Sequence, residues 1–159
     1  MGSNTLNTSP VKTADTLRAD ILAFEHLLSH LPSVVFGDAD CLPLTHAFAD
    51  GLYIRELCIP QGFLWVGKLH RYAHGHFLLR GEILVVTEFT GVVHQKAPQY
   101  MVTPAGTKLV GLALSDTTIV TVHATTETDL TKIEADIIAP GYAALVRDIR
   151  RHVVQEAPL

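Results

Sequence analysis

Residues 67–81, GKLHRYAHGHFLLRG, place three histidines within seven positions between two glycines. His74 and His76 are two residues apart, so on a strand their side chains project from the same face. His70 precedes them across a predicted turn, which would let three imidazoles converge. Neutral imidazole is a common ligand for divalent transition metals, and three of them leave coordination positions open for water or substrate. The stretch therefore predicts a histidine-lined site on a strand.

Short β-rich segments surround this stretch and extend from residue 46 to residue 124. No helix of crossover length interrupts them, which argues against a parallel α/β sheet. About eight short strands separated by turn residues are typical of an antiparallel sandwich or barrel. The predicted strands are 52–58, 63–69, 74–79, 82–88, 92–95, 99–103, 108–114 and 117–124.

Helical periodicity lies on both sides of the β-rich region. Before it, a helix is predicted over 13–31, with Thr13 as N-cap and with an end imposed by Pro32. After it, residues 128–155 predict two helices, the first from near Thr128 and the second after Pro140. The apolar stripes that carry these predictions are Leu17, Ile21, Phe24, Leu28 and Leu31 in the first region, and Leu130, Ile133, Ile137, Leu145, Ile149 and Val153 in the second.

Composition limits the class of protein. The 159 residues suit one domain, which we place at 13–159 behind a flexible tail at 1–12. Apolar residues make up 48% and charged residues 18%, as in a globular chain. The net charge is -4 without a basic block, which argues against nucleic-acid binding. We find neither a signal peptide nor an apolar run of about 20 residues, so a cytoplasmic protein away from the membrane is expected.

The stretch from Gly67 to Gly81, followed by EILVV, resembles the first conserved motif of the cupin superfamily. Residues 104–106, Pro-Ala-Gly, resemble the turn that opens the second cupin motif. The resemblance covers about residues 46–139. The combination of LYIRE, GKLH, PAGTK, TVHATTETDL and KIEADII is similar to small single-cupin proteins of phages and bacteria. It implies an antiparallel double-stranded β-helix, or jelly-roll barrel, with an N-terminal helix and C-terminal helices outside it, and a homodimer.

The chain departs from the general cupin pattern at two of its four metal positions. Lys68 stands in the place of the first histidine, and Leu109 in that of the second motif's histidine. His70 occupies the second histidine position and His74 the glutamate position, so other histidines would have to complete the set. The candidate ligands for a divalent ion, which could be Zn, Fe, Ni or Mn, are His70, His74, His76 and His123.

Three charged residues are candidates for ligand binding. Lys68 would attract an anionic ligand if it points into the barrel, and otherwise extends to the surface. Arg55 and Glu56 are consecutive on a strand, so only one of them faces the interior. If the apolar set with Leu52 faces the core, then Glu56 shares that face and Tyr53 lies outside with Arg55. The sequence leaves this choice open.

The sequence leads to two hypotheses for the function. The first is a divalent-metal-dependent enzyme acting on a small, anionic molecule. The second is a non-catalytic ligand-binding or assembly module without metal, which would explain Lys68 and Leu109 in the usual ligand positions. The remaining histidines are placed away from the site: two on the polar face of the first helix, one in a loop, one near a β-turn and one on an exposed helix face, namely His26, His30, His46, His94 and His152.

Overall fold

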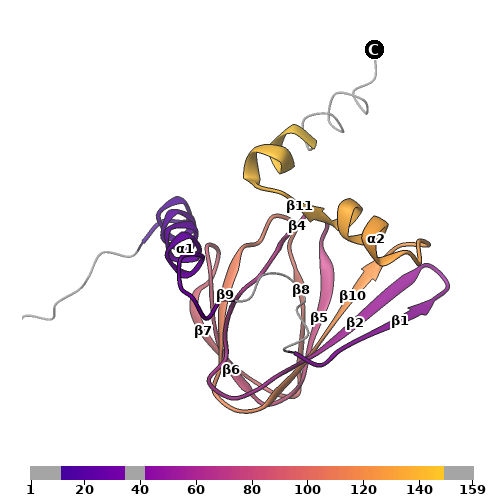
Figure 1. Cartoon of the computed structure of the whole chain (residues 1–159), viewed down its shortest axis with the longest axis horizontal. Coiled ribbons are helices and arrows are strands. Elements are labelled where there is room, and N and C mark those ends of the chain that lie inside the picture. The colour runs from indigo at the N-terminus through magenta and orange to yellow at the C-terminus, as the bar shows by residue number, and fades with distance from the viewer. Residues whose placement is uncertain (1–11, 35–41, 149–159) are drawn as a thin grey trace, which may run out of the picture.

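The computed structural model describes residues 12–34 and 42–148, and Figure 1 shows two β-sheets facing one another. The five-stranded sheet has the order β1 (Leu44–Ala49), β2 (Leu52–Ile59), β10 (Thr117–Ala124), β5 (His74–Arg80) and β8 (Gln99–Thr103). The four-stranded sheet has the order β3 (Leu64–Val66), β9 (Leu109–Ala113), β6 (Glu82–Thr87) and β7 (Gly91–Lys96). A short ribbon pairs β11 (Ile138–Ala139) with β4 (Leu69–His70).

Every paired strand is antiparallel to its neighbour. From β5 to β10 the chain alternates between the two sheets, apart from the β6–β7 hairpin. The chain passes from β5 to β6 through Gly81, whose φ of 88° suits glycine and whose missing Cβ leaves room for the Asp116 carbonyl. This connectivity is that of a double-stranded β-helix. The predicted fold class is confirmed.

The strands differ from prediction in several places, including β11, which was not predicted. The segment expected as one strand over 63–69 is divided into β3 and β4. The strand expected over 82–88 ends at Thr87. β1 was missed, although Asp50-Gly51 is the dipeptide that a two-residue hairpin turn favours. Gly51 has a φ of 77° there, and the hairpin pairs β1 with β2 along its length.

The first helix, α1, spans Ala14–Leu28 and lies beside the four-stranded sheet (Figure 1). Thr13 is its N-cap, as predicted, and accepts a hydrogen bond from the Thr16 amide at 3.3 Å. The helix ends three residues earlier than predicted, because the Ser29 hydroxyl donates to the His26 carbonyl at 2.7 Å and caps the last turn. Leu31 is consequently outside the helix and 51% exposed.

The C-terminal region begins with α2, Leu130–Ile137, whose N-cap is Asp129. Residues 142–148 are also helical, and Leu145 is buried there as predicted. The predicted apolar positions Ile149 and Val153 lie outside the described residues, as do His152 and the predicted tail up to residue 11. Among the helices that the structure describes, none has the length and apolarity needed to cross a membrane.

The core is divided along the barrel. One cluster of aliphatic side chains fills the space between the sheets: Ile59, Leu78, Ile83, Val85, Ala113 and Ile119. At the end of the barrel near α2 (Figure 1), Tyr53 packs against Ile133 and Ile137 instead. There the ribbon of β4 and β11 crosses the barrel end, with the Arg71 amide donating to the Ile137 carbonyl at 2.8 Å. Polar side chains gather beneath this cover.

Candidate metal centre

Three histidines from three strands meet at the covered end of the barrel. His70 lies on β4, His74 on β5 and His123 on β10. Their ring centroids are 4.2 Å apart for His70 and His74, 5.2 Å for His70 and His123, and 4.7 Å for His74 and His123. One nitrogen of each ring lies within 4.8 Å of the other two. We call these three residues the histidine cluster.

The strand pairing explains why the cluster forms. β10 and β5 are antiparallel neighbours, and the inward face of β10 carries Ile119, Thr121 and His123 at alternate positions. His70 reaches the same place because Ile138 pairs with it in the ribbon and the Gly106 amide donates to its carbonyl at 2.8 Å. Residues that are 53 positions apart in the chain thus share one site.

Burial keeps the cluster neutral. His74 and His123 are 6% and 5% exposed. Loss of hydration lowers the pKa of His70 to about 3, helped by the charges of His74 and His123 and opposed by a hydrogen bond to the Lys68 main chain. Burial is also the first cause that lowers the pKa of His123, to about 4, and of His74. At neutral pH all three rings therefore offer lone pairs.

The cluster has the chemistry of a metal site. Nδ1 of His74 is buried without a hydrogen-bond partner among the described residues, and a buried polar atom of this kind calls for an explanation. Two nitrogens bound to one tetrahedral zinc ion at about 2.0–2.1 Å lie about 3.3 Å apart, so the rings would have to close by up to about 1.5 Å to share an ion. The donor set fits a divalent transition metal.

His76 lies on the same face of β5 as His74, as predicted, but outside the cluster. It pairs with Thr121 of β10 and Met101 of β8, one step further into the barrel. Its Nε2 is buried without a hydrogen-bond partner among the described residues. Burial lowers its pKa to about 4, with a smaller contribution from His74.

The structure decides which of Arg55 and Glu56 faces the barrel. Tyr53 is 4% exposed and stacks on His123, with centroids 5.9 Å apart. Arg55 shares the face of Tyr53, and its charge contributes to the lowered pKa of His70 and His123. Glu56 lies on the opposite face with Leu52, which is 40% exposed. The aromatic ring sits inside because α2 covers it, so the alternative with Leu52 in the core is wrong.

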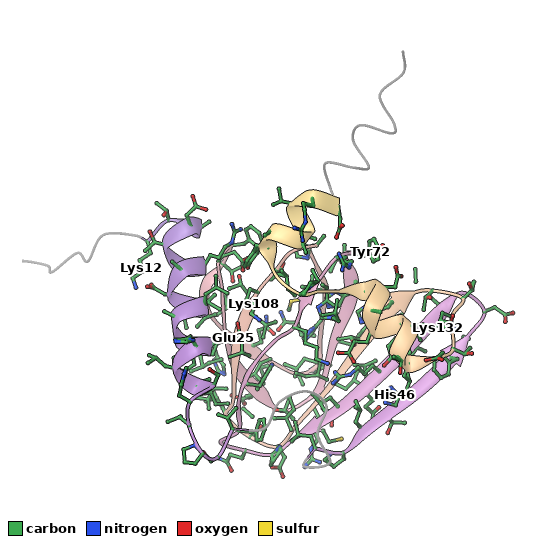
Figure 2. All side chains as sticks on the ribbon, turned by 45° about the horizontal axis from the view of Figure 1, so that its top comes forward. Lys12, Glu25, His46, Tyr72, Lys108 and Lys132 are labelled. Atoms are coloured by element: carbon green, nitrogen blue, oxygen red, sulfur yellow. The ribbon has the colours of Figure 1, made fainter. Side chains whose placement is uncertain are left out.

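Lys68 extends away from the cluster. Its ammonium donates to Glu134 of α2 at 2.7 Å, and its side chain lines a cavity of about 220 Å³. Other walls of this cavity come from Glu25 and Lys108, which pair at 2.7 Å and lie together in Figure 2. Leu69 also lines it, whereas the residues of the histidine cluster are not among its lining residues.

His46 was expected in a loop but lies on β1, labelled in Figure 2. The register places it opposite Arg55, and its Nδ1 is 2.8 Å from the Tyr53 hydroxyl. The missed Asp50-Gly51 hairpin is the signal that would have placed it. His94 lies within β7 and pairs with Glu82 at 3.1 Å.

His26 lies on the exposed face of α1, as expected, whereas His30 follows the end of the helix; both are exposed, with ring centroids 4.6 Å apart. Among the described residues, neither of them belongs to the group of histidines that could share a metal ion.

A buried carboxylate, Glu88, was missed by sequence reasoning. It accepts hydrogen bonds from the Tyr142 hydroxyl at 2.8 Å and the Lys108 amide at 3.0 Å. Arg18 of α1 lies 3.7 Å from it and stacks on the Tyr142 ring at 4.4 Å. Burial, followed by Glu88 itself, raises the pKa of Tyr142. This group joins α1 and the C-terminal region to the barrel. A carboxylate two residues after the apolar run 83–86 was the available signal.

Comparison with known proteins finds similar solved structures at low sequence identity. The sequence matches no family model and no curated protein. Among solved structures, KdgF from Halomonas sp. is 14% identical over 60% of this chain and 90% of its own, with a TM-score of 0.49. The Cnp3 cupin domain of Schizosaccharomyces pombe is 19% identical over 69% of this chain and 81% of its own, with a TM-score of 0.47. A cupin superfamily protein from Desulfitobacterium hafniense is 11% identical over 59% and 86%, with a TM-score of 0.46.

The strand connectivity described above, together with the motif around residues 67–81, defines the fold as that of the cupin superfamily. Within that fold this chain carries a three-histidine cluster that could hold a metal ion. At these identities the similarity concerns the fold alone.

Proposed function

We propose that the protein is a metal-dependent enzyme acting on a small molecule, with a divalent ion held by His70, His74 and His123. The observation that carries this proposal is the convergence of three neutral imidazoles, two of them buried, of which His74 has a nitrogen without a hydrogen-bond partner among the described residues. Zinc, iron, nickel and manganese all remain candidates, because imidazole suits each of them. A bound ion would polarise a substrate oxygen or activate water or dioxygen.

The surrounding residues hold the ligands in place. The main chain of Lys68 bonds to the His70 ring, and that of Tyr72 to the His74 ring. Tyr53 stacks on His123 and is itself fixed by His46. Contacts of this kind set the orientation of metal-binding imidazoles and typically change affinity by about 10–100-fold when removed.

Among the charged candidates, Arg55 is best placed to meet a ligand in the barrel. It shares the inner face of β2 with Tyr53, whereas Glu56 lies on the outer face and Lys68 pairs with Glu134 beyond β4. The substrate would be small, since the cluster is almost closed from solvent.

The test is the metal content of untagged protein, measured by elemental mass spectrometry. Wild type should carry close to one equivalent after metal loading and dialysis, and His70→Ala and His74→Ala should lose it. His94→Gln is the matched control, because that histidine lies on the exposed face of β7. Equal metal content in wild type and His70→Ala would reject the proposal. Absence of uptake by every variant would favour the non-catalytic module.

We also propose a homodimer. β8 is one of the two edge strands of the five-stranded sheet, and its outward residues Tyr100 and Val102 are 77% and 71% exposed. An edge strand with an apolar outer face is a surface that a second copy can cover. Light scattering should give twice the chain mass, and Val102→Glu should reduce it to one; a monomeric wild type would reject the dimer.

A further inference from the structure

The histidine cluster is closed off from solvent. His74 and His123 are 6% and 5% exposed, and Tyr53, which stacks on His123, is 4% exposed. A metal ion and a substrate both have to reach these rings if the site works as proposed. One of the elements that cover the cluster therefore has to move.

α2 and the first residue of β11 form this part of the cover, and we call residues 129–138 the lid. Ile133 and Ile137 of the lid pack on Tyr53, in a group of buried side chains separate from the one that fills the barrel. Lifting the lid would leave the barrel core intact. A segment packed in this way opens locally, at a lower free energy than unfolding of the whole domain.

The polar side-chain contacts between the lid and the barrel lie at the surface. The Lys68 ammonium donates to Glu134 at 2.7 Å, and the Tyr72 hydroxyl donates to Asp136 at 3.5 Å. The side chains of Lys68 and Glu134 are 33% and 56% exposed, so water competes for this pair and its contribution is small. Contacts of this strength favour the closed lid without fixing it there.

One of the three histidines stands on the strand that the lid pairs with. Ile138 pairs with His70 in the ribbon of β4 and β11, and the Arg71 amide donates to the Ile137 carbonyl at 2.8 Å. The other two histidines belong to the five-stranded sheet. An ion bound by all three would tie the lid's partner strand to the barrel. Metal binding and closure of the lid are therefore coupled.

The two ends of the lid suit a hinged movement. Before it, residues 125–128 belong to no helix or strand. After it, Ala139 is 4% exposed and lies in the same buried cluster as Leu69, which anchors the chain beyond the lid. Ile138 lines the cavity of about 220 Å³ described above, so it has space into which it can move.

We infer that residues 129–138 form a lid that opens to admit the metal ion and the substrate, and that a bound ion holds the lid closed. This inference rests on the proposed metal centre and adds the gate that controls access to it. A gate of this kind changes the rates of entry and exit, whereas a group that positions the ligands changes the affinity.

The first experiment measures zinc uptake and zinc release with the full-length protein, in stopped flow with a chromogenic chelator. Glu134→Ala removes the partner of Lys68, so the lid should open about two- to fivefold more often, the effect of one exposed ion pair. Uptake and release should both become faster by this factor. The zinc affinity should stay within about twofold of wild type, because the pair holds the lid with and without the ion.

Lys132→Ala is the matched control on the same helix. Lys132 pairs with Glu127 at 3.5 Å, in the segment before the lid, and this pair does not reach the barrel stretch 68–72. Its rates should equal those of wild type. Circular dichroism of both variants verifies that they are folded.

The second experiment measures hydrogen exchange of the wild-type protein by mass spectrometry. Without zinc, the amides of residues 130–138 should exchange faster than those of β5 and β10. Saturating zinc should slow exchange in the lid at least tenfold, because opening then requires the release of His70 from the ion. β6, which carries none of the three histidines, should change much less.

The outcomes separate the lid from the metal centre. Zinc binding that leaves exchange in residues 130–138 unchanged rejects the lid and leaves the metal centre standing. The same holds if Glu134→Ala and Lys132→Ala change the rates equally. Weaker zinc affinity in Glu134→Ala without faster uptake would assign Glu134 to positioning and also overturn the gate. If zinc does not bind to wild type at all, the metal centre and this inference fall together.

Discussion

The ring of Tyr53 stacks on the ring of His123 with centroids 5.9 Å apart, while its hydroxyl lies 2.8 Å from Nδ1 of His46. One side chain therefore joins β1, β2 and β10 at the histidine cluster. Tyr53 is in turn packed under Ile133 and Ile137 of α2. The orientation of a candidate ligand thus depends on the packing of the C-terminal helix.

Replacing Tyr53 tests this dependence. Tyr53→Leu removes the stacked ring and should weaken metal binding about tenfold. Tyr53→Phe keeps the ring and loses only the hydroxyl, so its affinity should stay within about threefold of wild type. Competition with a chromogenic chelator measures both. Equal losses in the two variants would assign the effect to the hydroxyl and His46 instead of the ring.

Acid should destabilise the metal-free protein through its histidines. The pKa values of about 3 for His70 and about 4 for His76 and His123 lie below the unfolded value of about 6.5. Between these values the unfolded chain binds more protons, so stability present above pH 6.5 is lost as the pH falls toward 4. The expected loss is on the order of 3 kcal/mol for each of these histidines.

Urea unfolding of metal-free protein at pH 7, 5.5 and 4.5 measures this loss. The double variant His70→Gln with His123→Gln should have a flatter pH dependence in the same window. If its dependence is as steep as that of wild type, other groups are responsible for the acid sensitivity.

The buried carboxylate Glu88 should be a structural requirement. Glu88→Gln removes the charge that faces Arg18 and weakens the hydrogen bond from Tyr142, so the free energy of unfolding should fall by about 2 kcal/mol. Thermal unfolding then shifts down by several degrees. The control is Glu82→Gln, which breaks exposed pairs with Lys96 and His94 and should change little. Similar shifts for both variants would contradict a special role for Glu88.

Close packing across the four-stranded sheet makes Gly111 sensitive to substitution. The ring of Trp65, its cross-strand partner, occupies the space that a Cβ at this position would need. Gly111→Ala should therefore destabilise the protein by about 2 kcal/mol, because the indole has to move. Gly141→Ala is the matched control, since its Cβ would meet nothing within 4 Å. Calorimetry of both variants gives the comparison, and an unaffected Gly111→Ala would mean that Trp65 repacks freely.

Sequence patterns predicted the elements well where periodicity was strong. The apolar stripe through Ile21 placed α1, and alternation placed β2, β5 and β10. Local hydrogen bonds decided the rest, such as the Ser29 cap that shortened α1 and the Asp50-Gly51 turn that formed β1. These are interactions of single side chains or single turns, which average hydrophobicity does not register.

The candidate site could be predicted only in part from the sequence. His70, His74 and His76 were selected because they are neighbours in sequence, and His123 as a more distant candidate. The cluster contains His70, His74 and His123 but not His76. Alternation along β5 gave the shared face of His74 and His76 correctly. Alternation along β5 could not predict how far these two histidines lie from His70. That distance depends on the pairing of β4 with β11, which is distant in the sequence.

By itself the sequence determined the alternation of faces, the positions of most strands and helices, and the supply of imidazoles around residues 67–81. Those properties follow from the two-residue and 3.6-residue repeats of the backbone, which are local. Only the tertiary structure decided that Tyr53 and Arg55 turn inward, that His123 completes the cluster and that Lys68 leaves it. These outcomes depend on which surfaces α2, β11 and the neighbouring strands cover, and burial is a property of the assembled barrel.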